Sequence, residues 1–105
     1  MILATSEDVI GKEIDETLGL VRGNTIRARN FGRDIAALLR NIIGGEVRDY
    51  TKMMAEAREQ ALDRMVAEAE SLGADAIVSI RFSTSFIMQG AAELLAYGTA
   101  VRFKK

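Results

Sequence analysis

The sequence predicts an α+β fold, a two-layer β-α-α-β-β subunit with a mainly antiparallel three-stranded sheet covered by two helices. Two kinds of periodicity support this prediction. Apolar residues recur with a period of two before residue 29 and after residue 75, and at helical spacing between residues 30 and 72. The 105 residues match the usual size of one domain, so we assign residues 1–105 to a single domain.

The first 28 residues have the pattern of extended chain. Within residues 11–28, apolar and polar side chains alternate as in a strand with one buried face. The predicted buried face carries Ile14, Leu18, Leu20 and Ile26. The opposite face carries Glu13, Asp15, Thr17 and Thr25. Two glycines inside this strand, Gly19 and Gly23, predict a bulge or a sharp bend, because glycine weakens a regular strand.

Two helices joined by a tight corner are predicted next. Asn30 is a suitable N-cap for a first helix over residues 31–43. Gly44 stands at the C′ position, and Gly45 adds a second flexible residue before the chain reverses. The second helix, residues 48–72, is long for so small a domain. We therefore expect one end of it to project beyond its own sheet or to pack on a neighbour.

Two strands are predicted after Gly73, which ends the long helix. Residues 76–88 place their apolar side chains on one parity. The last strand, in residues 93–105, is apolar on both parities and has no charge between Glu93 and Arg102. Such a strand is usually central and covered on both sides. We expect the helices to cover one face and a second subunit to cover the other.

A basic segment is the best candidate for ligand binding. Residues 22–48 hold six arginines against Asp34 and Glu46, a net charge of +4 in a chain of net charge −1. Arginines beside a helix N-terminus can bind an anion. The same arginines could instead form ion pairs with the acidic N-terminal segment of a neighbouring subunit. The candidate ligand residues are Arg29, Arg33, Tyr50 and Arg58.

No catalytic residue is predicted. The chain has neither histidine nor cysteine, and it lacks the phosphate-binding loop with its glycine spacing and lysine. A function without catalysis is therefore the main prediction, with no cofactor. The alternative is an enzyme that acts on a small anionic metabolite at a site between subunits, built from the four ligand residues named above.

Nucleic acid and membrane are excluded as predicted partners. A pI near 5.5 and only six aromatic residues do not fit a nucleic-acid binder. The N-terminal residues lack the basic region and apolar run of a signal peptide, and no apolar stretch reaches membrane-spanning length. These features predict a cytoplasmic protein.

Several motifs resemble the YbjQ-like family of uncharacterised proteins. They are "LGLVRG", "IIGGEVRDY", "AREQAL", "LGADAIVSI" and "AYGTAVRF", which together span the chain in order. The resemblance implies a dodecin-like subunit with strand order 1-3-2, assembled into a homopentamer. It also carries the label "putative heavy-metal-binding". Soft metals favour thiolate, thioether or imidazole ligands, and this chain offers five methionines only, so we predict no metal site.

The predicted function is that of a homo-oligomeric, structural or ligand-binding domain whose partner is itself, with a small anion as its candidate ligand.

Overall fold

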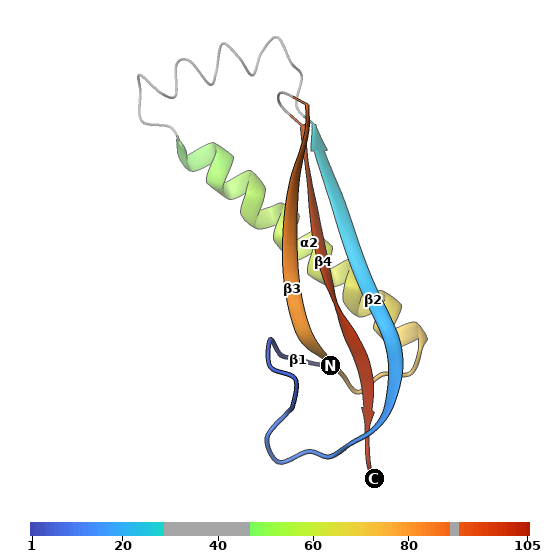
Figure 1. Cartoon of the computed structure of the whole chain (residues 1–105). Helices are drawn as coiled ribbons and strands as arrows, with labels where there is room; N and C mark the ends of the chain where they lie inside the picture. Colours follow the sequence, from blue (N-terminus) through green and yellow to red (C-terminus); the bar gives the residue numbers. More distant parts are fainter. Residues whose placement is uncertain (29–46, 89–90) are drawn as a thin grey trace.

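The computed structural model describes residues 1–28, 47–88 and 91–105. In these residues a four-stranded sheet packs on one helix that crosses it diagonally (Figure 1). The elements are β1 (Ile2–Leu3), β2 (Ile14–Ala28), α2 (Val47–Ser71), β3 (Ala76–Met88) and β4 (Ala91–Phe103). The α+β prediction is confirmed. The predicted first helix and the corner at Gly44 and Gly45 lie outside the described residues.

The sheet has the order β1-β3-β4-β2. Its three long strands are antiparallel neighbours with the last strand, β4, in the centre, as predicted from its two apolar faces. The prediction of three strands was incomplete. A fourth strand, β1, pairs in parallel with β3 through Ile2 and Leu3 and makes the sheet mixed. Two residues are too few to give a period-two signal.

The predicted face of β2 is wrong over most of its length. Val21, Gly23 and Thr25 are buried against α2, whereas Leu20 and Ile26 are 61% and 58% exposed on the other face. The cause is a bulge, which the sequence did predict at Gly19. The pairing with β4 shifts between Thr17 and Gly19, and Gly19 has a φ of +124°. The extra residue reverses which parity faces the helix.

Gly23 serves a different purpose from the predicted bend. A Cβ atom at this position would lie 2.5 Å from the Met65 nitrogen and closer still to the Ala61 carbonyl oxygen. The backbones of β2 and α2 therefore approach so closely that only glycine fits between them.

The helix-facing core is built on small residues. Ala57, Ala61, Met65 and Ala69 follow one another at intervals of four along α2 and are fully buried. They pack on side chains of all three long strands, including Val21, Ile77, Leu94, Ala96 and Ala100. The small alanine side chains allow α2 to lie close to the sheet, and the absence of a side chain at Gly23 allows the same from the side of β2.

A second bulge divides the side chains of β3 between the two faces. Ser79 has a φ of +55°, and the register with β4 shifts between Val78 and Arg81. Ile77 and Ile80 consequently join the helix-facing core, while Ala76 and Val78 pack with Val101 on the opposite face. The prediction of one continuous apolar parity from residue 76 to residue 88 was therefore wrong.

The face of the sheet opposite α2 is covered only in part. Val9, Ile14 and Phe103 pack against Ala76, Val78 and Val101, so the N-terminal segment covers the end of this face near the C-terminus. The rest of the face, toward the far end of the β3–β4 hairpin in Figure 1, has no cover from the described residues. Among those residues, no helix is both long and apolar enough to cross a membrane.

Candidate functional site

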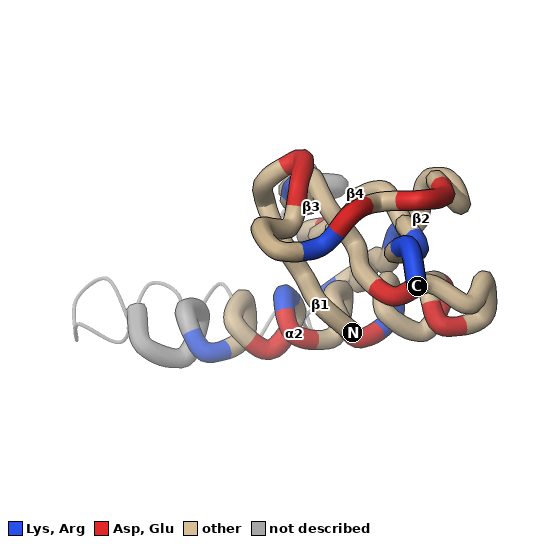
Figure 2. The backbone as a smooth tube through the Cα atoms, turned by 90° about the horizontal axis from the view of Figure 1, so that it is seen from below, with Lys and Arg blue, Asp and Glu red and all other residues tan. Residues whose placement is uncertain are grey.

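Only Arg58 of the four predicted ligand residues has a described side chain, so their grouping stays a prediction. Arg29 and Arg33 lie outside the described part of the chain. Tyr50 and Arg58 both belong to α2, and the Arg58 side chain is exposed. Along the described part of α2, basic and acidic residues are interspersed (Figure 2). A surface of mixed sign does not concentrate positive potential for an anion or a nucleic acid.

A shallow hollow of about 450 Å³ lies between the end of β2 and the first half of α2. It is lined by Arg27, Lys52, Ala55, Glu56, Glu59 and Gln60. An Nη atom of Arg27 donates to the Gln60 side-chain oxygen at 2.8 Å, while its buried Nε has no partner among the described residues. Two basic and two acidic residues line the hollow, so it is balanced in charge.

The outer edge of β2 is closed by side chains of α2. Glu68 accepts a hydrogen bond from the Arg22 amide at 3.3 Å, and Arg64 donates to the Asn24 carbonyl oxygen. Both main-chain groups point away from β4, so they would otherwise be free to pair with another strand. Thr25 adds a buried hydrogen bond from its hydroxyl to the Ala57 carbonyl at 3.1 Å. The helix therefore protects the middle of this edge.

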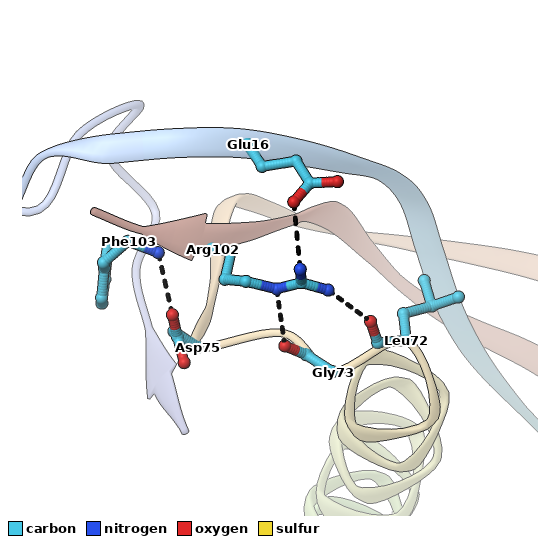
Figure 3. Close-up of polar contacts among 6 residues, drawn as sticks. All are labelled: Glu16, Leu72, Gly73, Asp75, Arg102 and Phe103. Atoms are coloured by element: carbon cyan, nitrogen blue, oxygen red, sulfur yellow. Dashed lines mark hydrogen bonds and ion pairs between the residues drawn. The ribbon is translucent and has the colours of Figure 1, made fainter. Parts of the chain in front are cut away.

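Arg102 is the centre of the most connected polar cluster (Figure 3). Its Nη1 pairs with Glu16 at 3.0 Å, its Nη2 donates to the Leu72 carbonyl, and its Nε donates to the Gly73 carbonyl, both at 3.2 Å. The last turn of α2 contains no basic residue of its own. Arg102 thus supplies, from β4, the positive charge that stabilises a helix C-terminus.

A backbone conformation and one further hydrogen bond fix the turn between α2 and β3. Gly73 has a φ of +77°, the left-handed conformation that often follows a helix. Asp75 accepts a hydrogen bond from the Phe103 amide at 2.8 Å (Figure 3). With three of its five N–H groups engaged inside the chain, Arg102 has a structural role at this turn.

Sequence reasoning missed the Arg102 cluster and the edge contacts of α2. Arg102 lies 86 residues from Glu16 and 30 from Leu72. One signal was available, since a long helix with no basic residue in its last turn needs a cation from elsewhere. The role of Arg64 and Glu68 had no such signal, because their partners are main-chain groups of β2.

Exposed apolar side chains gather at two places on the sheet. Leu20 and Ile26 lie on the face opposite α2, diagonally across from the half-buried Tyr97 and Leu95 of β4, whose direct partners are Arg22 and Asn24. Phe82 and Phe86 lie on the helix-facing side of β3 and are 46% and 78% exposed, because α2 packs mainly on β2 and β4. Contiguous exposed apolar surface is typical of surfaces that bind a partner.

The chain lacks the thiolate and imidazole ligands that soft metals favour. The sequence has no cysteine and no histidine, and the described residues contain no group of three carboxylates placed to hold an ion. Of the five methionines, Met65 is fully buried in the helix-facing core and Met54 packs against it. The residues present therefore do not fit a heavy metal.

Comparison with known proteins places this chain among uncharacterised relatives. A UPF0145 protein of Halorubrum lacusprofundi is 60% identical over 104 residues, which cover 99% of this chain and all of that protein. A UPF0145 protein of Pseudothermotoga lettingae is 58% identical over 105 residues, covering 100% and 99% of the two chains.

A solved structure from Pediococcus pentosaceus, described as a protein of unknown function in the DUF74 family, has the same fold. It superposes with a TM-score of 0.70 at 16% identity and covers 99% of this chain and 98% of its own. The sequence profile of the YbjQ family, described as "Putative heavy-metal-binding", matches residues 1–104. This chain therefore belongs to the YbjQ family of UPF0145 proteins.

Proposed function

We propose that the protein is a self-assembling domain, a homo-oligomer whose structural or ligand-binding role depends on contacts between copies. The observation that carries this proposal is the apolar strip on the face opposite α2, formed by Leu20, Ile26, Leu95 and Tyr97. Two large aliphatic side chains on this strip are more than half exposed in the single chain. Covering them with a second copy would remove that apolar surface from water.

The dimensions of the single chain support the proposal. Its radius of gyration is 17.4 Å, whereas a compact domain of about 100 residues has a value near 13 Å. Its accessible surface is 7146 Å², whereas a folded monomer of 11.5 kDa exposes about 5,800 Å². The excess is comparable to the area that one subunit buries in a stable interface.

The family resemblance favours a ring of five copies as the form of this assembly. A ring needs a contact between two different surfaces of neighbouring subunits. The apolar strip provides one such surface in every copy. If the role is ligand binding, small anions would bind between subunits, near Arg29, Arg33, Tyr50 and Arg58. The described residues provide no observation that favours the enzymatic alternative.

Native mass spectrometry of the untagged protein tests the proposal. The wild-type chain is expected at five times the mass of one subunit, or at ten times where two rings join. The double variant Leu20→Asp/Ile26→Asp is expected to fall to smaller species, because a charge on this strip cannot be buried without a partner. Ala67→Asp, on the exposed side of α2, is the matched control and is expected to keep the wild-type mass. Circular dichroism would verify that each variant is folded.

Two results would overturn the proposal. One is a wild-type protein that remains monomeric at tens of micromolar. The other is a folded double variant that assembles as well as the wild type.

A further inference from the structure

The outer edge of β3 is divided into a covered part and an open part. The N-terminal segment covers the first part, where Ala4 donates to the Ile77 carbonyl at 2.9 Å and accepts from the Ile80 amide at 3.1 Å. Arg81 then donates from its side chain to the Thr5 carbonyl at 2.9 Å. Beyond Arg81, no strand of the described residues pairs with this edge.

Within residues 1–28, 47–88 and 91–105, the main-chain groups on the outer side of this open part have no strand partner. The Ile80 amide points outward, toward Ala4. Because main-chain groups alternate in direction along a strand, those of Phe82, Thr84 and Phe86 point outward as well. A row of free donors and acceptors on an edge strand is a template for another strand.

This edge also lacks the features that normally prevent such pairing. No charged residue occurs between Arg81 and Glu93, and the chain contains no proline. Phe82 and Phe86 are exposed on the helix-facing side, beside the open edge. The contrast with β2 is direct, since Arg64 and Glu68 of α2 close the middle of that edge.

The sequence of the open edge reads the same in both directions. Residues 82–86 are Phe-Ser-Thr-Ser-Phe, with Thr84 at the centre. When two copies of this segment run antiparallel about Thr84, each Phe82 faces a Phe86, each Ser83 faces a Ser85, and the two Thr84 residues face each other. Because the outward groups belong to residues 82, 84 and 86 in both copies, the hydrogen-bonded pairs coincide in this register.

We propose that β3 of one copy pairs antiparallel with β3 of a second copy about a two-fold axis at Thr84. This inference rests on the proposed self-assembly and names a contact within it. Both aromatic pairs fall on the side of the joined sheet that carries α2, where cross-strand aromatic pairs are favourable. A self-complementary edge fits a second copy of this chain better than a foreign peptide, because each side chain meets its own match.

A two-fold contact doubles the number of copies in the assembly that the other contacts form. Together with a ring of five copies it gives ten, and without a ring it gives two. The contact is thus separable from the apolar strip that carries Leu20 and Ile26, which lies on the opposite face of the sheet.

Thr84→Pro tests the contact by mass. Proline removes the outward amide of residue 84 and leaves the ladder with β4, which uses neighbouring groups, in place. This variant is expected to have half the native mass of the wild-type assembly. Thr84→Val keeps the amide and the branched side chain, so its mass is expected to equal that of the wild type.

Engineered cysteines test the register without depending on the proline variant. The chain has no native cysteine, so an introduced thiol is unique. Thr84→Cys is expected to form a disulfide-linked dimer under mild oxidation, because Cα atoms of a hydrogen-bonded pair lie about 5.5 Å apart. Phe82→Cys alone is expected to remain unlinked. Co-expressed Phe82→Cys and Phe86→Cys chains are expected to link to each other.

The outcomes separate this inference from the proposed function. If the wild type is monomeric, both fail. If the wild type is oligomeric but a folded Thr84→Pro variant keeps its full mass and Thr84→Cys does not link, the strand pairing is overturned and self-assembly stands. Linking of Phe82→Cys alone would likewise overturn the proposed register.

Discussion

The guanidinium group of Arg102 donates to the carbonyl oxygen of Leu72 at 3.2 Å, and so joins the end of β4 to the end of α2. The same side chain reaches Gly73 and Glu16, so one residue connects two strands and the helix terminus (Figure 3). A terminus with no basic residue of its own receives its positive charge through tertiary structure.

Arg102→Ala is expected to lower the free energy of unfolding by about 2 kcal/mol, because it removes charge-assisted hydrogen bonds to two helix-terminal carbonyls. Most of this effect should come from the carbonyl contacts. The ion pair with Glu16 is 40% and 53% exposed, and surface pairs contribute about 0–1 kcal/mol. Urea denaturation at fixed protein concentration would measure the change. Arg58→Ala, on the exposed side of α2, serves as the control, and an equal loss in both variants would contradict the assigned role.

Gly23→Ala is expected to cost about 3 kcal/mol or more, or to prevent folding, because the added methyl group overlaps the backbone of α2 at Ala61 and Met65. Neither backbone can move away without separating the helix from the sheet. The adjacent Asn24→Ala is the control, since its side chain is exposed. Soluble yield and thermal denaturation would compare the two variants. A stable Gly23→Ala protein would show that the two elements are farther apart.

Ser79 is a further test, because it holds a left-handed conformation that costs a non-glycine residue about 1–2 kcal/mol. Ser79→Gly should relieve that cost and lose part of the gain to chain entropy, for a net change within about 1 kcal/mol of the wild type. Ser79→Val should be destabilising by about 1–2 kcal/mol relative to the wild type, since a β-branched side chain fits this conformation poorly. Ser83→Val, at a regular exposed position of β3, is the control in thermal denaturation. Equal melting temperatures for the two valine variants would argue against the bulge.

Soft-metal binding gives a prediction that bears on the label of the family. Isothermal titration with Cd²⁺ or Zn²⁺ is expected to show no stoichiometric site, because the chain has no thiolate or imidazole ligand. Treatment with a chelator is likewise expected to leave the melting temperature unchanged. A saturable site with one metal per subunit would show that carboxylates or thioethers of different copies combine as ligands.

The sequence was informative where a pattern extends over many residues. The two apolar faces of β4 correctly predicted a central strand, and the long apolar stripe correctly predicted α2. It was misleading where one residue changes the phase. The bulges at Gly19 and Ser79 each shift the register with β4 by one residue, and the bulge at Gly19 transfers Leu20 and Ile26 to the face opposite the helix.

Contacts between distant parts of the chain were beyond sequence reasoning. The N-terminal segment covers Val78 and Val101 through Val9, which no local pattern indicates. The part of the face that it covers was expected to need a second subunit. For the candidate ligand site, Arg58 alone has a described side chain, so the grouping of Arg29, Arg33, Tyr50 and Arg58 remains a prediction.

The closed edge of β2 has a consequence for how large an assembly of this chain can grow. A sheet with two open edges can add strands at both sides without end, which is the geometry of a fibril. Here Arg64 and Glu68 obstruct one side, so growth by strand addition is confined to the other. If the open edge of β3 pairs with the same edge of a second copy, that one pairing leaves no edge for further strands. Removing the side chains of both Arg64 and Glu68 would therefore be expected to convert a finite assembly into a polymer.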